Sequence, residues 1–204
     1  MSGTNVDARM VKELREETGL PVMKCKEALT ASGGDKDKAK EILRKKGMET
    51  AIIKGSRATK EGAVGAYVHF NNRVGVMVEL GCESDFVAKN SEFQQLLKDV
   101  AMHIAFADPA VLSREQVPAE TVAKEQEIYR AQVEEAGGGK KKPAEVVEKI
   151  VAGKLDKFYA EKCLLDQPFY KDDKLKVSEL LQQAVAKLGE NIVVRRFSRM
   201  EVGR

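Results

Sequence analysis

The chain has 204 residues, of which 43% are apolar and 33% charged, so it can form a packed core and is not wholly disordered. No apolar run approaches the roughly 18 residues of a membrane helix, and the first ten residues contain no signal-peptide core. We therefore expect a cytoplasmic protein with no membrane contact. Three scattered cysteines and two histidines exclude a disulfide framework, a CxxC zinc site and histidine-rich metal chemistry.

The net charge of +3 is unevenly distributed. Residues 1–60 hold 14 Lys and Arg against 9 Asp and Glu, whereas the remainder of the chain is slightly acidic. A basic N-terminal part can mark a contact with nucleic acid or the ribosome, or it can be a solvated surface. We favour the solvated surface and expect no direct nucleic-acid binding.

Residues 6–50 are predicted to form three short helices. Gly19 suits the left-handed residue after the first helix, and Pro21 suits the first turn of the second. Asp35 can cap the third helix, which we expect to stop at Gly47. A unit of about 45 residues has only a small core. It is therefore either a docking module or a piece that leans on another part of the chain.

Two alternating segments after residue 62 predict a β-hairpin. The residues expected to face the core from the first strand are Val64, Ala66, Val68 and Phe70. Those expected to face it from the second are Val74, Val76, Val78, Leu80 and Cys82. Asn71-Asn72 suits the tight turn because asparagine tolerates a positive φ. On this register, His69 points outward.

The middle of the chain is predicted to be helical. Ser91 is expected to cap a helix that ends at Asp108-Pro109, with Gln94 completing a capping box. Helices over 119–136 and from Pro143 to about Lys162 resemble an antiparallel pair. The loop "GGGKKKP" between them could bind a phosphate backbone electrostatically, but we favour a mobile tip without that role.

A last amphipathic helix ends at Gly189 and is followed by a third strand. One face of this strand carries Ile192, Val194, Met200 and Val202. Arg196 shares that face, which indicates a strand at the edge of its sheet. Three strands far apart in sequence imply a small antiparallel sheet with helices on one side, an α+β fold. We divide the chain into a helical docking module (1–53), a linker (54–62) and an α+β core (63–204).

The sequence contains no recognisable catalytic site. No phosphate loop, GxGxxG, HExxH or GxSxG motif is present. His69 and His103 are interpreted as structural, and Cys25 and Cys82 as small core residues. No nucleophile, base and orienting group come together, so we expect a protein that is not an enzyme and uses no cofactor or metal.

The segment Ser84–Val87 places an aromatic residue just past a strand end, beside an acid. In one interpretation, Ser84 or Asp85 caps a helical turn and Phe86 packs on Leu97 as a hydrophobic staple. In the other, Phe86 is a protruding wedge, because aromatic residues on rigid corners often dominate protein interfaces. The residues alone leave both interpretations open.

Two long stretches resemble the signatures of the elongation factor Ts family. "KELREETGLPVMKCKEAL" (12–29) is similar to the N-terminal signature, and "VGVMVELGCESDFVAKNSEF" (74–93) is similar to the second one. Ser84 stands where the family has threonine, which keeps the hydroxyl. "AMHIA" and "GENIVVRRF" also fit, so the resemblance covers essentially the whole chain in order.

The resemblance implies a guanine-nucleotide exchange factor for elongation factor Tu, the GTPase that carries aminoacyl-tRNA. Such a factor binds Tu in its GDP-bound and nucleotide-free states, accelerates GDP release and stays bound until GTP binds. The resemblance further implies a docking module similar to ubiquitin-associated domains, with Arg15, Gly19, Val22 and Met23 nearest the GTPase. It places Asp85 and Phe86, within Ser84–Val87, beside the magnesium and phosphate site of the partner.

Longer family members carry two copies of the sheet-and-helix core, and this chain has room for one. We therefore expect a homodimer that supplies the second half. The alternative function is a non-catalytic protein- or ribosome-binding module with a ubiquitin-associated-like domain and no exchange role. A third class, an enzyme of unknown type, is disfavoured by the missing catalytic grouping.

Overall fold

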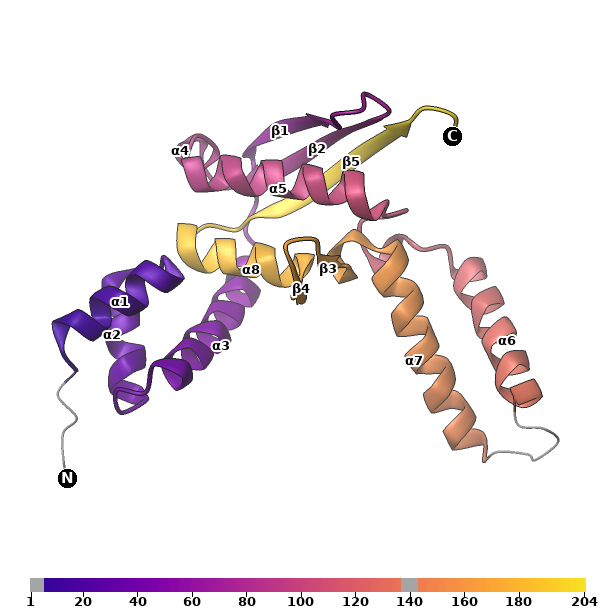
Figure 1. Cartoon of the computed structure of the whole chain (residues 1–204), viewed down its shortest axis with the longest axis horizontal. Helices are drawn as coiled ribbons and strands as arrows, with labels where there is room; N and C mark the ends of the chain where they lie inside the picture. The colour runs from indigo at the N-terminus through magenta and orange to yellow at the C-terminus, as the bar shows by residue number, and fades with distance from the viewer. Residues whose placement is uncertain (1–5, 137–142) are drawn as a thin grey trace. The chain divides into compact units, whose positions relative to one another are not determined.

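The computed structural model describes residues 6–136 and 143–204 (Figure 1). The loop predicted around "GGGKKK" falls on residues 137–142, outside the described residues. The described residues form helices and a three-stranded sheet in the order β1-β2-β5, which confirms the predicted α+β fold. In chain order the main elements are α1 (Ala8–Thr18), α2 (Val22–Ala31), α3 (Lys36–Lys54), β1 (Glu61–Val68), β2 (Val74–Cys82), α4 (Asp85–Ala88), α5 (Ser91–Ala107), α6 (Ala119–Ala136), α7 (Ala144–Lys162), β3 (Pro168–Phe169), β4 (Asp172–Lys176), α8 (Val177–Leu188) and β5 (Val193–Glu201).

The chain separates into two compact units. Unit 1 contains the residues up to Gly65 together with Val78–Asp99 and Glu179–Arg195. Unit 2 contains Ala66–Met77, Val100–Ser178 and Arg196–Arg204. The sequence-based boundaries of the docking module, the linker and the core stay predictions. None of the described helices is both long and apolar enough to span a membrane.

The three N-terminal helices in unit 1 form a small bundle of their own. The buried residues at its centre are Val11, Leu14, Cys25, Ala28, Leu29, Ala39 and Leu43. Gly19 ends α1 with a φ of 65°, and its N–H donates to Arg15 O at 2.7 Å, as predicted for a C-terminal glycine. Asp35 caps α3, also as predicted.

The predicted stop of α3 at Gly47 is wrong, because the helix continues to Lys54. A Cβ atom at Gly47 would lie 3.3 Å from Cβ of Ala186 in α8. Glycine is therefore used here for close helix packing, which needs a missing side chain rather than a left-handed backbone.

The register predicted for the first strand is inverted. Val64, Val68 and Phe70 are 60%, 63% and 87% exposed, whereas Gly65 lies on the half-buried face. A Cβ atom at Gly65 would come within 2.7 Å of Leu97 Cγ in α5. The half-buried face of β1 thus carries Ala63, Gly65 and Tyr67. His69, predicted to point outward, is half-buried, and its Nδ1 lies 2.9 Å from the Tyr67 hydroxyl.

The second strand and the turn before it follow the prediction. Val76, Val78, Leu80 and Cys82 are buried. Asn72 has a φ of 55°, and the His69 N–H donates to Val74 O at 2.9 Å. The alternation of β2 is therefore sufficient to fix its face, because this strand lies in the middle of the sheet.

The third strand keeps its predicted face only at its start. Val194 is buried, but Met200 and Val202 are 64% and 58% exposed. Arg199 is the half-buried residue instead, and its guanidinium donates to Ala105 O and pairs with Asp108 at 3.2 Å. Carbonyls at the C-terminal end of a helix attract a cation. Arg199 therefore turns toward the end of α5, while β5 is an edge strand with Arg196 exposed, as predicted.

The start of α5 differs from the prediction in one residue. Asn90, not Ser91, caps the helix, since its Oδ1 accepts the Glu92 N–H at 2.8 Å. Gln94 donates to Ala88 O at 2.6 Å instead of completing a capping box. The helix ends at Ala107 and is followed by Asp108 with a positive φ, which confirms the predicted stop.

Unit 2 holds the predicted helical pair, with α6 and α7 side by side (Figure 1). Arg130 and Glu148 join the two helices through two hydrogen bonds, at 2.9 and 3.2 Å. At the base of the pair, Arg114 binds Asp166 and Asp156 and lies 4.6 Å from the ring centre of Tyr159. The sequence did not predict the two-stranded sheet β3–β4, whose strands are too short to show alternation.

His103 is fully buried in unit 2 and has a structural role, as predicted. Its Nε2 lies 3.0 Å from Gln167 Oε1, and its Nδ1 accepts the Tyr170 N–H at 3.3 Å. This pair of partners requires the neutral imidazole with its proton on Nε2. Burial lowers the pKa of His103, and the hydrogen bond to Gln167 opposes part of that shift.

We expect the free energy of unfolding to fall between pH 7.5 and 5.5 because burial disfavours the protonated form of His103. The pKa of His103 in the folded chain lies below the ordinary value of 6.5 that applies to the unfolded chain. The stabilisation is complete above the unfolded pKa and is lost as the pH falls through the folded one. Urea unfolding at both pH values measures this fall, and His103→Gln should reduce it. His69→Gln is the control and should leave the fall in the free energy of unfolding unchanged. If His103→Gln also leaves it unchanged, another group causes the pH dependence.

Candidate partner-binding site

The segment Ser84–Val87, here called the tip, follows directly after the central strand β2. Ser84 has extended backbone, and its hydroxyl accepts the Val87 N–H at 3.4 Å, so it caps the four-residue helix α4. Ala88 at the end of this helix is buried, whereas Val87 is half-buried. The tip is thus a single helical turn fixed at the end of a buried strand.

Phe86 projects from the tip into solvent and is 82% exposed. The staple interpretation, in which this ring packs on Leu97, is therefore wrong. Leu97 is buried, and its side chain lies against Gly65 instead. An exposed phenyl ring on an anchored turn has the geometry of a wedge for a partner.

Asp85 lies beside this ring and is paired within the tip's own helix. The Lys89 ammonium donates to Asp85 Oδ2 at 2.8 Å. This hydrogen bond lowers the pKa of Asp85, so its carboxylate is ionised at neutral pH. The tip therefore presents an apolar ring that is adjacent in sequence to a carboxylate paired with Lys89.

The four residues predicted to dock on the partner meet at the corner between α1 and α2. Arg15 and Gly19 end α1, and Val22 and Met23 begin α2. All four are exposed, with Val22 at 46% and Met23 at 64%. We call these four residues the docking corner. The tip and the docking corner both belong to unit 1.

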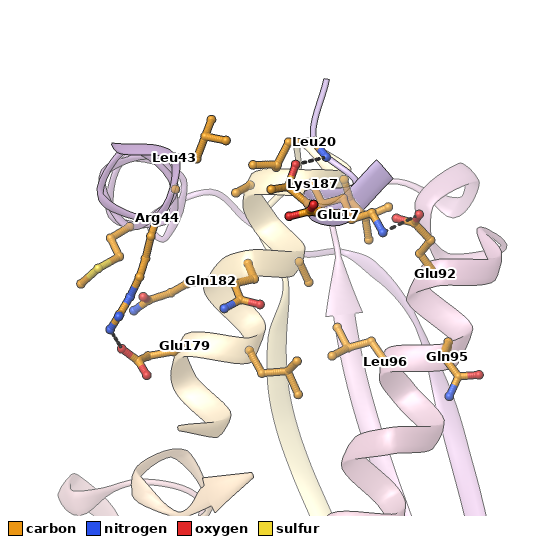
Figure 2. A pocket seen from close by; sticks show the side chains of 18 of the residues that line it. Glu17, Leu20, Leu43, Arg44, Glu92, Gln95, Leu96, Glu179, Gln182 and Lys187 are labelled. Atoms are coloured by element: carbon orange, nitrogen blue, oxygen red, sulfur yellow. Dashed lines mark hydrogen bonds and ion pairs between the residues drawn. The ribbon is translucent and has the colours of Figure 1, made fainter. Parts of the chain in front are cut away.

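A groove of about 570 Å³ runs between α3, α5 and α8 within unit 1 (Figure 2). Arg44 reaches Glu179 at 2.8 Å, and Lys187 reaches Glu92 at 2.7 Å, so charges at its rim are paired. Among the residues that the structure describes, no three His, Cys, Asp or Glu are grouped to hold a metal ion. The groove lining also contains no His or Cys to serve as a nucleophile or base.

Two polar residues that sequence reasoning missed hold the tip from the α8–β5 connection. Glu190 accepts hydrogen bonds from the tip, and Asn191 bonds to Glu83 just before it. They belong to the "GENIVVRRF" stretch, so that motif was the available signal. Their contact with the tip spans more than a hundred residues of sequence.

Comparisons with known proteins agree with the two signatures. The family model described as "Elongation factor TS" matches residues 11–204. An elongation factor Ts from Anaeromyxobacter sp. (strain Fw109-5) is 56% identical over 97% of this chain and 89% of its own length. Those from Thermodesulfovibrio yellowstonii and Fervidobacterium nodosum are 54% and 51% identical, over 96% and 98% of their lengths. The chain therefore belongs to the elongation factor Ts family of translation elongation factors.

Proposed function

We propose that this protein accelerates the release of GDP from elongation factor Tu and stays bound to the empty GTPase until GTP binds. The observation that carries the proposal is the tip, where Phe86 is 82% exposed beside the ionised Asp85. The tip also occupies the position of the family's second signature. In this proposal the ring and the carboxylate enter the partner beside its magnesium and phosphate site.

The proposed action requires no chemistry on the factor itself. In GTPases, a magnesium ion and backbone N–H groups hold the phosphates of the nucleotide. A wedge that shifts these elements weakens GDP binding. Linkage requires that GDP lowers the affinity of the GTPase for the exchange factor by the same ratio. A thousandfold effect corresponds to about 4 kcal/mol of differential binding, which a few interface residues can supply. We accordingly infer that the protein is an exchange factor and not an enzyme.

Docking and displacement are assigned to different parts of unit 1. The docking corner offers two exposed apolar side chains, Val22 and Met23, on a bundle with its own core. The docking corner would supply affinity for the GTPase in both of its states. The tip would make the binding free energy differ between the GDP-bound and the empty GTPase. This division predicts that the two sites affect different kinetic parameters.

Stopped-flow release of a fluorescent GDP from elongation factor Tu tests the proposal. The expected result is a strong, saturable rise of the release rate with the concentration of this protein. If the intact protein gives no acceleration at any concentration, the exchange function is wrong. Salt-sensitive binding to ribosomes in that case would favour the alternative, a ribosome-binding module.

We further propose a homodimer formed through the open face of the sheet in unit 2. This open-face patch consists of Val68, Phe70, Met77, Met200 and Val202, each more than half exposed. Exposed apolar residues gathered on one face of a sheet are candidates for an interaction site. A two-fold axis would bring the patches of the two protomers into contact with each other. The core of the second protomer would then take the place of the second core that longer family members contain within one chain.

Phe70→Asp is expected to convert the dimer to a monomer, because it buries a charge in the proposed interface. Light scattering on a sizing column measures the mass, with 22.5 kDa for one chain and twice that for the dimer. Phe106→Asp is the matched control, since Phe106 is 78% exposed but lies on α5. A wild-type mass of one chain at working concentration would contradict the dimer.

A further inference from the structure

The carboxylate of Glu190 holds the backbone at the first residue of the tip and at Glu83 just before it. Its Oε2 accepts the N–H groups of Glu83 and Ser84 at 3.1 and 2.9 Å. Its Oε1 accepts the Ser84 hydroxyl at 2.6 Å. Three donors therefore converge on one ionisable group, and hydrogen bonds to a charged acceptor are the strong ones.

Glu83 in turn binds the α8–β5 connection, and Asn191 of that connection also binds the segment that follows α3. The Asn191 N–H donates to Glu83 Oε1 at 2.7 Å. The side-chain amide of Asn191 donates to the carbonyls of Gly55 and Arg57, at 3.3 and 2.8 Å. We call Glu83, Glu190 and Asn191 the clamp. It joins the residue after β2, the α8–β5 connection and the chain leaving the N-terminal bundle.

The tip needs such an anchor because it cannot position Phe86 by itself. A helix of four residues has little stability of its own. The ring is 82% exposed, so packing of the side chain does not fix its direction. The direction of the ring is therefore set by the backbone of residues 83–85, and Glu190 binds that backbone.

We propose that Glu190 is a positioning residue for nucleotide exchange, which acts by holding the tip so that Phe86 enters the partner in one orientation. This inference rests on the exchange function proposed above. The hydrogen bonds of Glu190 go to Glu83 and Ser84, and not to any residue of the docking corner. Loss of Glu190 should therefore lower the maximal rate of GDP release and leave the concentration for half-saturation nearly unchanged.

Glu190→Ala and Glu190→Gln separate positioning from charge. The alanine variant leaves two backbone N–H groups without their acceptor, and we expect the maximal release rate to fall at least about tenfold. The glutamine variant can accept both N–H groups with its oxygen and donate to the Ser84 hydroxyl. It should stay within about threefold of the wild type. Glu179→Ala is the matched control, because Glu179 is also in unit 1 and pairs with Arg44 rather than the tip.

A double-mutant cycle tests whether Glu190 acts through Phe86. In a Phe86→Ala background, adding Glu190→Ala should change the maximal release rate by less than about twofold. If the second substitution lowers the rate tenfold again, Glu190 acts on something other than the wedge and the inference is wrong. A half-saturating concentration that rises in parallel with the loss of rate would overturn it as well.

Hydrogen exchange gives a readout that is independent of elongation factor Tu. The amides of Glu83 and Ser84 should lose protection in Glu190→Ala and keep it in Glu190→Gln, with the core of unit 1 protected in both. Unchanged protection in the alanine variant would overturn the positioning role, whatever the exchange rates are. If the wild type fails to accelerate GDP release, the exchange function fails, and lost protection then establishes the anchor alone.

Discussion

Replacing Phe86 with alanine is expected to lower the maximal rate of GDP release from elongation factor Tu by about thirtyfold or more, without lowering the melting temperature. The ring is 82% exposed, so the free protein loses little packing when it is removed. Surface substitutions of this kind change the free energy of unfolding by about 0.5 kcal/mol or less. An interface hot spot contributes about 2 kcal/mol or more, which sets the expected loss of rate.

Stopped-flow release and thermal unfolding of the same preparation measure both quantities. Phe106→Ala serves as the control, since this ring is 78% exposed on α5 and has no assigned contact with the partner. We expect it to leave both measurements unchanged. A melting temperature that falls by several degrees in Phe86→Ala would show that the ring packs in the core, contrary to the structure.

Replacing Met23 with aspartate is expected to raise the concentration needed for half-maximal release by about tenfold or more and to leave the maximal rate unchanged. Met23 is 64% exposed at the docking corner, and a charge there opposes burial against the GTPase. An acidic residue in the first turn of α2 is favourable for the helix. The N-terminal bundle should therefore stay folded.

The concentration dependence of the release rate, compared with that of Val146→Asp, measures this effect. Val146 is 45% exposed in the first turn of α7, so the control places the same charge at a similar position of another helix. A lower maximal rate with unchanged half-saturation in Met23→Asp would contradict the separation of docking from displacement.

The sequence predicted best those elements whose own pattern decides their structure. The helix 119–136 has the predicted bounds, and the next one follows Pro143, because a start signal or long periodicity acts locally. The faces of β1 and β5 were mispredicted because they depend on neighbours. Leu97 selects the glycine face of β1, and the end of α5 draws in Arg199. Such contacts are not visible in a strand's own alternation.

For the candidate site too, the sequence predicted the location of its parts but not their exposure or their contacts. The tip could be located because an aromatic residue beside an acid is unusual just after a strand, but its exposure required the fold. Glu190 and Asn191 could not be connected to it, since hydrogen bonds between residues 83–84 and 190–191 have no periodic signature. The docking corner was found from its motif, and the structure adds that its four residues are exposed together.

The thiol of Cys82 has a consequence for how the factor responds to oxidants and alkylating agents. It is buried and donates to Ser84 O at 3.1 Å, directly beneath the tip. Burial, and then the negative charge of Glu190, raise the pKa of this thiol, so almost no reactive thiolate is present at neutral pH. We expect Cys82 to react with an alkylating agent only when the structure around it opens, because the folded chain buries its sulfur. The alkylation rate of Cys82 would therefore report local opening beside the tip.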